Sequence, residues 1–196
     1  MTNSNRVALL FSNLGRKKIQ ADFQGGKLTS DAGAALLREV DRRVDLIDAL
    51  ADCIADPRQP AKITHNLRTM LAQRILAIAL GYEDLNDHDS LRDDPLLQIL
   101  TERGINEQQP LASSSTLCRL ENRLDRKSLA KMAGVFVEQF IGSHSRAPDR
   151  IVLDFDATDD PVHGNQAGRF FHGYYDHYCF LPLYVFCGEQ LLLAYL

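Results

Sequence analysis

The sequence has 196 residues, of which 45% are hydrophobic and 24% charged, with 22 basic and 26 acidic side chains and a formal net charge of −4. This balance is typical of a folded soluble protein and excludes disordered and collagen-like chains. No stretch approaches the ~20 consecutive apolar residues that span a bilayer, and the N-terminus lacks a signal-peptide pattern. We therefore expect a cytoplasmic protein without membrane contacts.

The charges are distributed unevenly along the chain. Residues 151–196 contain one basic residue, Arg169, and six acidic ones. Residues 1–21 are basic without any acid, and residues 113–132 hold five basic residues against two acidic ones. Basic patches beside an acidic pocket suit a protein that holds a polyanion and performs metal chemistry on it. For any single patch, a solvated helix face is an equally good interpretation.

Helical patterns follow the basic N-terminal segment, residues 1–28. From Thr29 to about Ile54 apolar residues recur every three or four positions behind a Thr-Ser-Asp start that can cap a helix, which predicts an amphipathic helix bent midway. ITHNLRTMLAQRILAIALGY predicts a second helix that closes at Gly81. Residues 83–100 predict a turn, a short helix and another helix, with aspartates as caps, and residues 113–142 one short and one long helix. The pattern predicts an all-helical domain over residues 29–147.

Near Ala147-Pro148-Asp149 the apolar period changes to the period of strands. IVLDFDA, FFHGYYDHYCFLPLYVF and QLLLAYL predict three strands, the last two joined by a tight turn at 187–190, with most of the aromatic residues forming sheet core and hairpin pairs. The predicted fold is therefore α+β, with a helical domain followed by a sheet domain at residues 148–196.

Two carboxylates stand out in the first of these strands. Asp154 and Asp156 are two residues apart and share one face of an otherwise apolar strand. Hard carboxylate oxygens suit Mg²⁺ or Mn²⁺, ions that support phosphodiester chemistry. The alternative, equally favoured by spacing alone, is that one aspartate lies exposed at the strand end or caps the turn at Thr158.

Other polar residues carry weaker signals. His163 lies in a predicted loop, where it would orient phosphate or water, or simply be exposed. His172, His177 and the nearby cysteines have a spacing that fits no common zinc pattern, so we expect reduced, mostly buried thiols without metal. Arg119 and Arg123, spaced i and i+4 in SSSTLCRLENRL, suit a DNA-binding helix or an ordinary surface helix.

Three long motifs together resemble one family. LGYEDLNDHDSLRDDP, STLCRLENR and DFDATDDPVHGNQ…FFHGYYDHYCFLPL closely resemble the DDE transposases of bacterial insertion sequences, over roughly Phe23 to Leu196. The resemblance implies an RNase H-like catalytic domain, of which residues 148–196 would supply the first three antiparallel strands. It places the first catalytic aspartate of an Asp-x-Thr motif at Asp156, the first metal ligand, with Asp154, Thr158 and His163 in support.

The resemblance also implies a DNA partner and an incomplete set of catalytic residues. Double-stranded DNA of the terminal inverted repeats would be the substrate, bound by basic residues that we assign to Arg119, Arg123, Arg126 and Lys127. The family's second aspartate and its glutamate are not found before Leu196, so we expect a truncated transposase with weak Mg²⁺ or Mn²⁺ binding that is inactive alone. A homodimer or pairing with intact transposase fits this view. The alternatives are a non-catalytic DNA-binding inhibitor of intact transposase and a non-functional relic.

Overall fold

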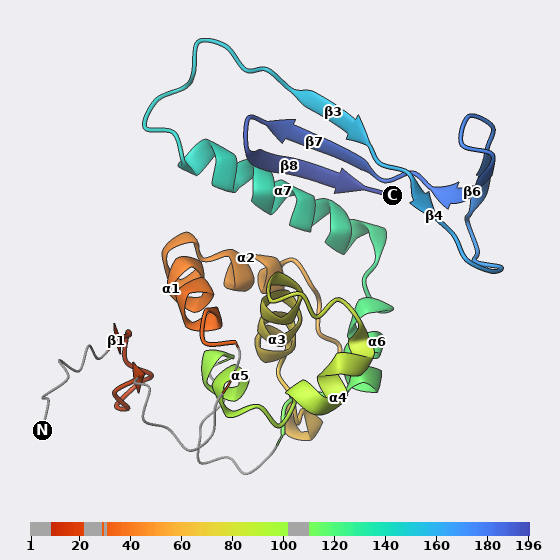
Figure 1. Cartoon of the computed structure of the whole chain (residues 1–196). Helices are drawn as coiled ribbons and strands as arrows, with labels where there is room; N and C mark the ends of the chain where they lie inside the picture. Colours follow the sequence, from red (N-terminus) through yellow and green to blue (C-terminus); the bar gives the residue numbers. More distant parts are fainter. Residues whose placement is uncertain (1–8, 22–28, 30, 102–109) are drawn as a thin grey trace, which may run out of the picture. The chain divides into compact units, whose positions relative to one another are not determined.

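The computed structural model describes residues 9–21, 29, 31–101 and 110–196 (Figure 1). The chain divides into two compact units, Met1–Asp125 and Arg126–Leu196, which we describe separately. The domain boundaries predicted from the sequence, at residues 28/29 and 147/148, stay predictions.

The N-terminal segment contains a small hairpin that the sequence patterns did not predict. Strands β1 (Leu9–Leu10) and β2 (Gln20–Ala21) pair in antiparallel fashion. Just after β1, the hydroxyl and the amide of Ser12 donate hydrogen bonds to the carboxylate of Glu39, which lies on the first helix. The basic residue Arg6 of this segment lies outside the described residues.

The predicted midway bend of the first helix is confirmed. Helix α1 (Ala34–Val44) ends where Asp45 adopts a left-handed conformation (φ 55°), and α2 (Leu46–Asp52) starts directly afterwards. The side chain of Asp41 accepts a hydrogen bond from the backbone amide of Ile47 (2.9 Å), which satisfies one of the free amides at the start of α2. The predicted Thr-Ser-Asp cap is wrong, because α1 begins after Gly33 without a side-chain cap.

A short 3₁₀ helix, η1 (Pro60–Lys62), precedes helix α3 (Leu67–Ala79), whose two ends are fixed by specific residues. The Asn66 side chain accepts a hydrogen bond from the amide of Thr69 (2.7 Å) and caps the N-terminus. At the other end Gly81 has φ +93°, and the amide of Tyr82 donates to the carbonyl of Ala77 (2.9 Å). This left-handed closure requires glycine and confirms the predicted helix end.

Aspartates cap two of the four short helices that the structure describes after α3, η2 (Leu85–Asp87) and α5 (Pro95–Leu100), as predicted. The other two are α4 (His88–Leu91) and α6 (Ser114–Glu121). Asp84 accepts a hydrogen bond from the amide of Asn86 (2.8 Å), and Asp94 accepts one from the amide of Leu97 (2.8 Å). Asp89 reaches from α4 to the start of α6, where it accepts bonds from the amide and the hydroxyl of Ser114.

A buried polar network lies at the centre of the first unit. Gln73 on α3 and His88 on α4 are both 0% exposed. The amide of Gln73 donates to the carbonyl of Ala112 (2.9 Å) and accepts from the Ala112 amide (3.0 Å), so it pairs with the backbone just before α6. Its nitrogen also lies 3.1 Å from His88 Nδ1. Because an amide nitrogen only donates, Nδ1 must accept and the neutral tautomer must carry its proton on Nε2.

The second unit combines one long helix with two small antiparallel sheets (Figure 1). Helix α7 (Arg126–Gly142) packs along β8. One sheet has the order β3-β7-β8 and the other β4-β6-β5. Their strands are β3 (Asp154–Ala157), β4 (Asp160–Pro161), β5 (Phe170–His172), β6 (His177–Phe180), β7 (Leu183–Cys187) and β8 (Gln190–Tyr195).

The prediction of a single strand over FFHGYYDHYCFLPLYVF is wrong, since this segment forms β5, β6 and β7. A turn separates β5 from β6: Asp176 has φ 56°, and its amide donates to the carbonyl of His172 (2.9 Å). Pro182, which cannot donate to a sheet ladder, lies between β6 and β7. The predicted turn at 187–190 is confirmed, with Cys187 paired to Gln190 and Gly188 at φ +60°.

The mixed helix and sheet content confirms the α+β class. The antiparallel β3-β7-β8 order is that of the predicted three-strand meander, and its assignment to the RNase H-like fold stays a prediction. Among the described residues, no helix is both long and apolar enough to cross a membrane.

Replacing Gln73 should destabilise the first unit. In Gln73→Leu the buried amide and carbonyl of Ala112 lose their partners, at about 1–3 kcal/mol for each unsatisfied group. We expect the free energy of unfolding to fall by roughly 2 kcal/mol or more, measured by urea denaturation. Gln59→Leu, at an exposed position of the same unit, is the matched control and should change stability little. Equal effects of the two changes would contradict the role of the network.

His88 should make this unit sensitive to mild acid. Burial, and secondarily the charge of Arg74, lower the pKa of His88. The unfolded imidazole takes up a proton below its ordinary pKa of about 6.5, whereas the folded one stays neutral until a lower pH. The stabilisation is therefore complete above about pH 6.5 and is lost as the pH falls towards the folded pKa.

The urea midpoint of the wild-type chain should accordingly decrease over this pH range. His163→Gln, which alters an exposed histidine, should keep the same dependence, and His88→Gln should flatten it. A wild-type midpoint that does not change between about pH 7.5 and 5.5 would contradict the prediction.

Candidate active site and neighbouring polar clusters

The two predicted carboxylates do share one face of a strand. Asp154 and Asp156 lie on β3, an edge strand of its sheet, opposite Phe186 and Tyr184 of β7. The residue between them, Phe155, lies opposite Val185 on the other face. Val185 is buried, whereas both aspartates are exposed. All four residues of β3 are exposed, so both carboxylates are accessible from solvent.

Neither aspartate is used to stabilise the local structure. Within the described part of the chain, no hydrogen bond or ion pair links the carboxylate of Asp154 or Asp156 to another residue. The turn that follows is held by backbone instead, because the amide of Thr158 donates to the carbonyl of Pro182 (3.1 Å). This arrangement argues against a capping role for either aspartate. The sequence also allowed one aspartate to lie exposed at the end of the strand, and this interpretation agrees with the structure.

The carboxylate oxygens at β3 are the type of ligand that a hard divalent cation prefers, but only two side chains supply them. Two unpaired carboxylates offer the oxygen ligands that Mg²⁺ and Mn²⁺ prefer. Within the described residues, however, the only group of three or more His, Cys, Asp and Glu side chains close enough to hold an ion lies elsewhere. Asp154 and Asp156 alone supply at most part of a coordination shell.

The other two supporting residues predicted from the sequence, Thr158 and His163, are both exposed. His163 precedes a turn in which Gly164 has φ +82°. Arg169 fixes this turn, since its guanidinium donates to the carbonyl of Gly164 and to the side chain of Asn165 and lies 4.4 Å above the centre of the Tyr178 ring. The single basic residue of this segment is thus engaged within its own loop.

A second polar cluster forms where the sequence did not predict one. Asp159, His177 and Cys179 offer ligand atoms that all lie within 4.8 Å of one another, and His177 Nε2 is 2.8 Å from Asp159 Oδ2. His177 and Cys179 lie two residues apart on β6, so strand periodicity places them on one face. Asp159 comes from the turn before β4. The spacing of residues in the sequence does not indicate that Asp159 belongs to the cluster. Asp159 comes close to His177 and Cys179 only because β4 pairs with β6.

The cluster does not have the properties of a nucleophilic cysteine site. Cys179 is fully buried. Its burial, followed by the hydrogen bond and the charge of the Asp159 carboxylate, raises the pKa of the Cys179 thiol. A nucleophilic cysteine needs an accessible thiolate. Cys179 is therefore a protonated, buried thiol. All four cysteines are free, as predicted, but only Cys53 and Cys179 are buried, whereas Cys118 is exposed and Cys187 half-buried.

Comparison with known families places this geometry in context. Residues 11–196 match the model of the family described as transposase DDE domain group 1. The chain belongs to this transposase family. The resemblance to insertion-sequence DDE transposases is thereby confirmed. Searches of curated proteins and of solved structures found no match to this transposase chain.

The basic residues assigned to DNA in the transposase chain differ in their surroundings. Arg119 is exposed on α6, and its guanidinium donates to the hydroxyl of Thr116 (3.3 Å). Helix α6 ends at Glu121, so the predicted extension of one helix face from Arg119 to Arg123 is wrong. Arg126 and Lys127 are exposed at the start of α7, in the second unit.

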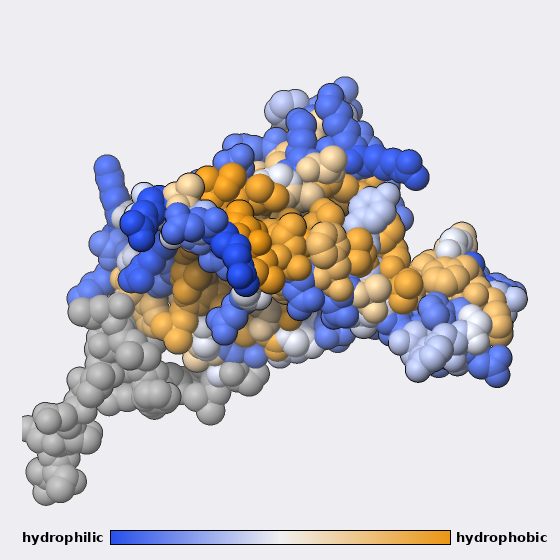
Figure 2. All heavy atoms as spheres, turned by 90° about the horizontal axis from the view of Figure 1, so that it is seen from above, coloured by the Kyte–Doolittle hydropathy of each residue, from blue (hydrophilic) through white to orange (hydrophobic). Residues whose placement is uncertain are grey.

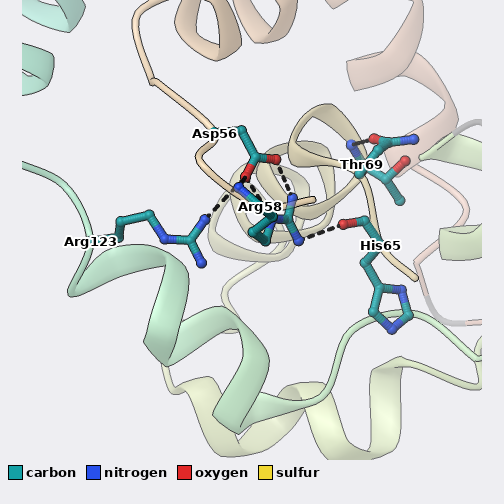
Figure 3. Close-up of polar contacts among 6 residues, drawn as sticks. Asp56, Arg58, His65, Thr69 and Arg123 are labelled. Atoms are coloured by element: carbon teal, nitrogen blue, oxygen red, sulfur yellow. Dashed lines mark hydrogen bonds and ion pairs between the residues drawn. The ribbon is translucent and has the colours of Figure 1, made fainter. Parts of the chain in front are cut away.

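Arg123 belongs to a local ion-pair network (Figure 3). Arg58 binds Asp56 through two nitrogens, at 2.7 and 2.6 Å, and donates to the carbonyl of His65 (2.9 Å). Arg123 lies 3.4 Å from the same Asp56 carboxylate. The hydrogen bonds from Arg58, more than the charge of Arg123, lower the pKa of Asp56. Arg123 therefore helps to fix the segment between α2 and α3.

Apolar side chains remain exposed in the strand segment of the transposase. Figure 2 shows apolar residues gathered in a broad patch on one face of the molecule. In the segment before and within β3, exposed apolar residues include Ile151, Val152, Leu153 and Phe155, the last with 63% exposure. The aromatic residues expected to form sheet core are largely at the surface, including Tyr174 with 85% exposure.

Proposed function

We propose that this chain acts in insertion-sequence transposition, in which element ends are cut by metal-assisted hydrolysis and the freed 3′-hydroxyl is joined to target DNA. The observation that carries the proposal is the pair of exposed, unpartnered carboxylates of Asp154 and Asp156 on one strand of a DDE-family transposase. Two charges held on one face without any partner favour a cation, which would relieve their mutual repulsion.

In this proposal Asp156 is the first metal ligand, and Asp154 supports it from the same strand face. Mg²⁺ or Mn²⁺, when bound, would activate the attacking oxygen and stabilise the leaving one. The backbone amide of Thr158 donates a hydrogen bond to the carbonyl of Pro182, which fixes the C-terminal end of β3. His163 lies in the following loop, whose turn Arg169 fixes, and is assigned to the phosphate or the attacking water.

The DNA partner is assigned to exposed basic residues. We propose that Arg119, Arg126 and Lys127 contact the phosphates of double-stranded terminal repeats, because each presents an exposed cationic side chain. Arg123, assigned to DNA together with them, is already neutralised in part by Asp56. Its contribution should therefore be smaller than that of Arg119. Such a protein would act in the cytoplasm, where bacterial DNA is accessible.

One observation favours a second candidate function. At β3 the described residues bring together two carboxylates and no third ligand-forming side chain. A chain with this donor set would bind DNA and hold metal weakly without cleaving, and would act as an inhibitor of intact transposase or as its pairing partner. Self-pairing as a homodimer is the related alternative.

Metal binding at β3 tests the assignment of Asp156. We expect weak Mn²⁺ binding by the wild-type chain, measured by paramagnetic relaxation of water protons, and a further loss in Asp156→Asn, because one of two ligands is removed. Asp176→Asn, which alters another exposed aspartate and keeps a residue that tolerates positive φ, is the matched control. Binding that survives in Asp156→Asn would contradict the assignment.

Strand cleavage separates the two candidate functions. With only two carboxylates at β3, the 196-residue chain should not nick a supercoiled plasmid that carries an element end, whichever metal is added. Metal-dependent nicking that disappears in Asp156→Asn would exclude the inhibitor hypothesis and establish a catalytic centre.

Salt dependence of DNA binding tests the basic residues. Arg119→Ala should weaken binding of element-end DNA and reduce the slope of log K against log salt by about one unit for each lost phosphate contact. Arg123→Ala should have a smaller effect on the slope, since Asp56 already offsets its charge. Lys62→Ala, at an exposed position elsewhere in the same unit, is the control, and fluorescence anisotropy gives the measurement. An unchanged slope in Arg119→Ala would assign this arginine to an ordinary solvated face.

A further inference from the structure

The Asp159–His177–Cys179 cluster has the composition of a metal site different from the one at β3. It combines one carboxylate oxygen, one imidazole nitrogen and one sulfur, all within 4.8 Å of one another. Oxygen-only sites suit Mg²⁺ and Mn²⁺, whereas a mixed set that includes sulfur suits Zn²⁺. The cluster lies in the small β4-β6-β5 sheet.

Strand geometry places these ligands without help from a metal. His177 and Cys179 point to the same face of β6 because they are two residues apart. Pro161 of β4 lies opposite Cys179, so Asp159, two residues earlier, belongs to the same face. Side chains from β6 and from the residue just before β4 therefore meet at one point, and placement on or beside rigid elements favours a preorganised site.

The separations suit a tetrahedral ion. Zinc–ligand distances of about 2.0–2.3 Å place neighbouring ligand atoms roughly 3.3–3.7 Å apart. The 2.8 Å contact between His177 Nε2 and Asp159 Oδ2 is a hydrogen bond, and it would need to lengthen by only about half an ångström. The other ligand atoms lie at most 4.8 Å apart, so their separations would shorten by up to about 1 Å.

The polar atoms of this cluster are also incompletely satisfied. Asp159 Oδ1 is buried and has no hydrogen-bond partner among the described residues. His172, which lies opposite His177 in the strand register, likewise has a buried Nδ1 without a partner. A buried polar group without a partner is unfavourable, because it has lost its hydrogen bonds to water. An ion bound between Asp159, His177 and Cys179 would satisfy the carboxylate.

We propose that Asp159, His177 and Cys179 form a zinc-binding site that fixes the small sheet between β3 and β7. Three protein ligands leave the fourth position of a tetrahedral ion to water. Because the site lies immediately after β3 and Thr158, its role is to hold the end of the strand that carries Asp154 and Asp156. The competing explanation is a metal-free ion pair between His177 and Asp159 beside a buried thiol.

Cobalt substitution tests the site without any use of DNA or activity. The purified full chain, stripped of metal with a chelator, is titrated with Co²⁺ and then with Zn²⁺. We expect one equivalent of Co²⁺ to give the visible bands of a tetrahedral ion and the near-ultraviolet band of thiolate ligation, with displacement by Zn²⁺ and none by excess Mg²⁺. Zinc should also raise the melting temperature of the chain.

Variants assign the ligands. Cys179→Ser should abolish the thiolate band, and Asp159→Asn and His177→Gln should weaken binding by at least the roughly 10–100-fold that loss of an outer-shell partner costs. Cys187→Ser and Asp160→Asn, which alter neighbouring residues outside the cluster, should bind like the wild type. Absence of the thiolate band from the wild-type chain would overturn the proposal, and this result does not depend on whether any variant folds. Persistence of the band in Cys179→Ser would overturn it as well.

Discussion

The side-chain amide of Gln73 forms a donor–acceptor pair of hydrogen bonds with the backbone, like the pairs that join neighbouring β-strands, although the unit is helical. By donating to and accepting from the backbone of Ala112, it joins α3 to the chain just before α6, and its contact with His88 adds α4. Leu111, next to Ala112, belongs to the hydrophobic cluster that includes Ala34 of α1, Leu76 of α3 and Leu97 and Leu100 of α5. The position of these helices therefore depends on one buried amide, because apolar packing alone does not fix the register of a chain segment that crosses a helix.

Several features of the fold could be predicted because they depend on neighbouring residues alone. The end of α3 at Gly81 follows from the need for a left-handed residue, and the aspartate caps follow from free amides at helix starts. The shared face of Asp154 and Asp156 follows from strand periodicity. Family motifs supplied the transposase assignment, which composition and spacing alone did not provide.

Other features were missed because they depend on contacts between distant residues. The division of residues 170–187 into three strands arises from a left-handed Asp176 and from Pro182, whose signals are weak within a long apolar run. Asp159 joins His177 and Cys179 only after β4 has paired with β6. Arg123 was expected on the face of a helix that in fact ends two residues earlier, and its link to Asp56 spans a large sequence separation. The fold class was therefore easier to predict than the polar clusters.

The small β4-β6-β5 sheet also affects how the strand that carries Asp156 can form. β3 pairs with β7, and residues 158–182 lie between them. Closing a loop of that length as an unstructured chain carries an entropy cost that grows with the logarithm of its length. The β5–β6 hairpin, with its short turn at Asp176, is a local contact, and β4 pairs with β6. These pairings shorten the free loop between the ends of β3 and β7, which lowers the entropy cost of pairing the strand that bears the carboxylates.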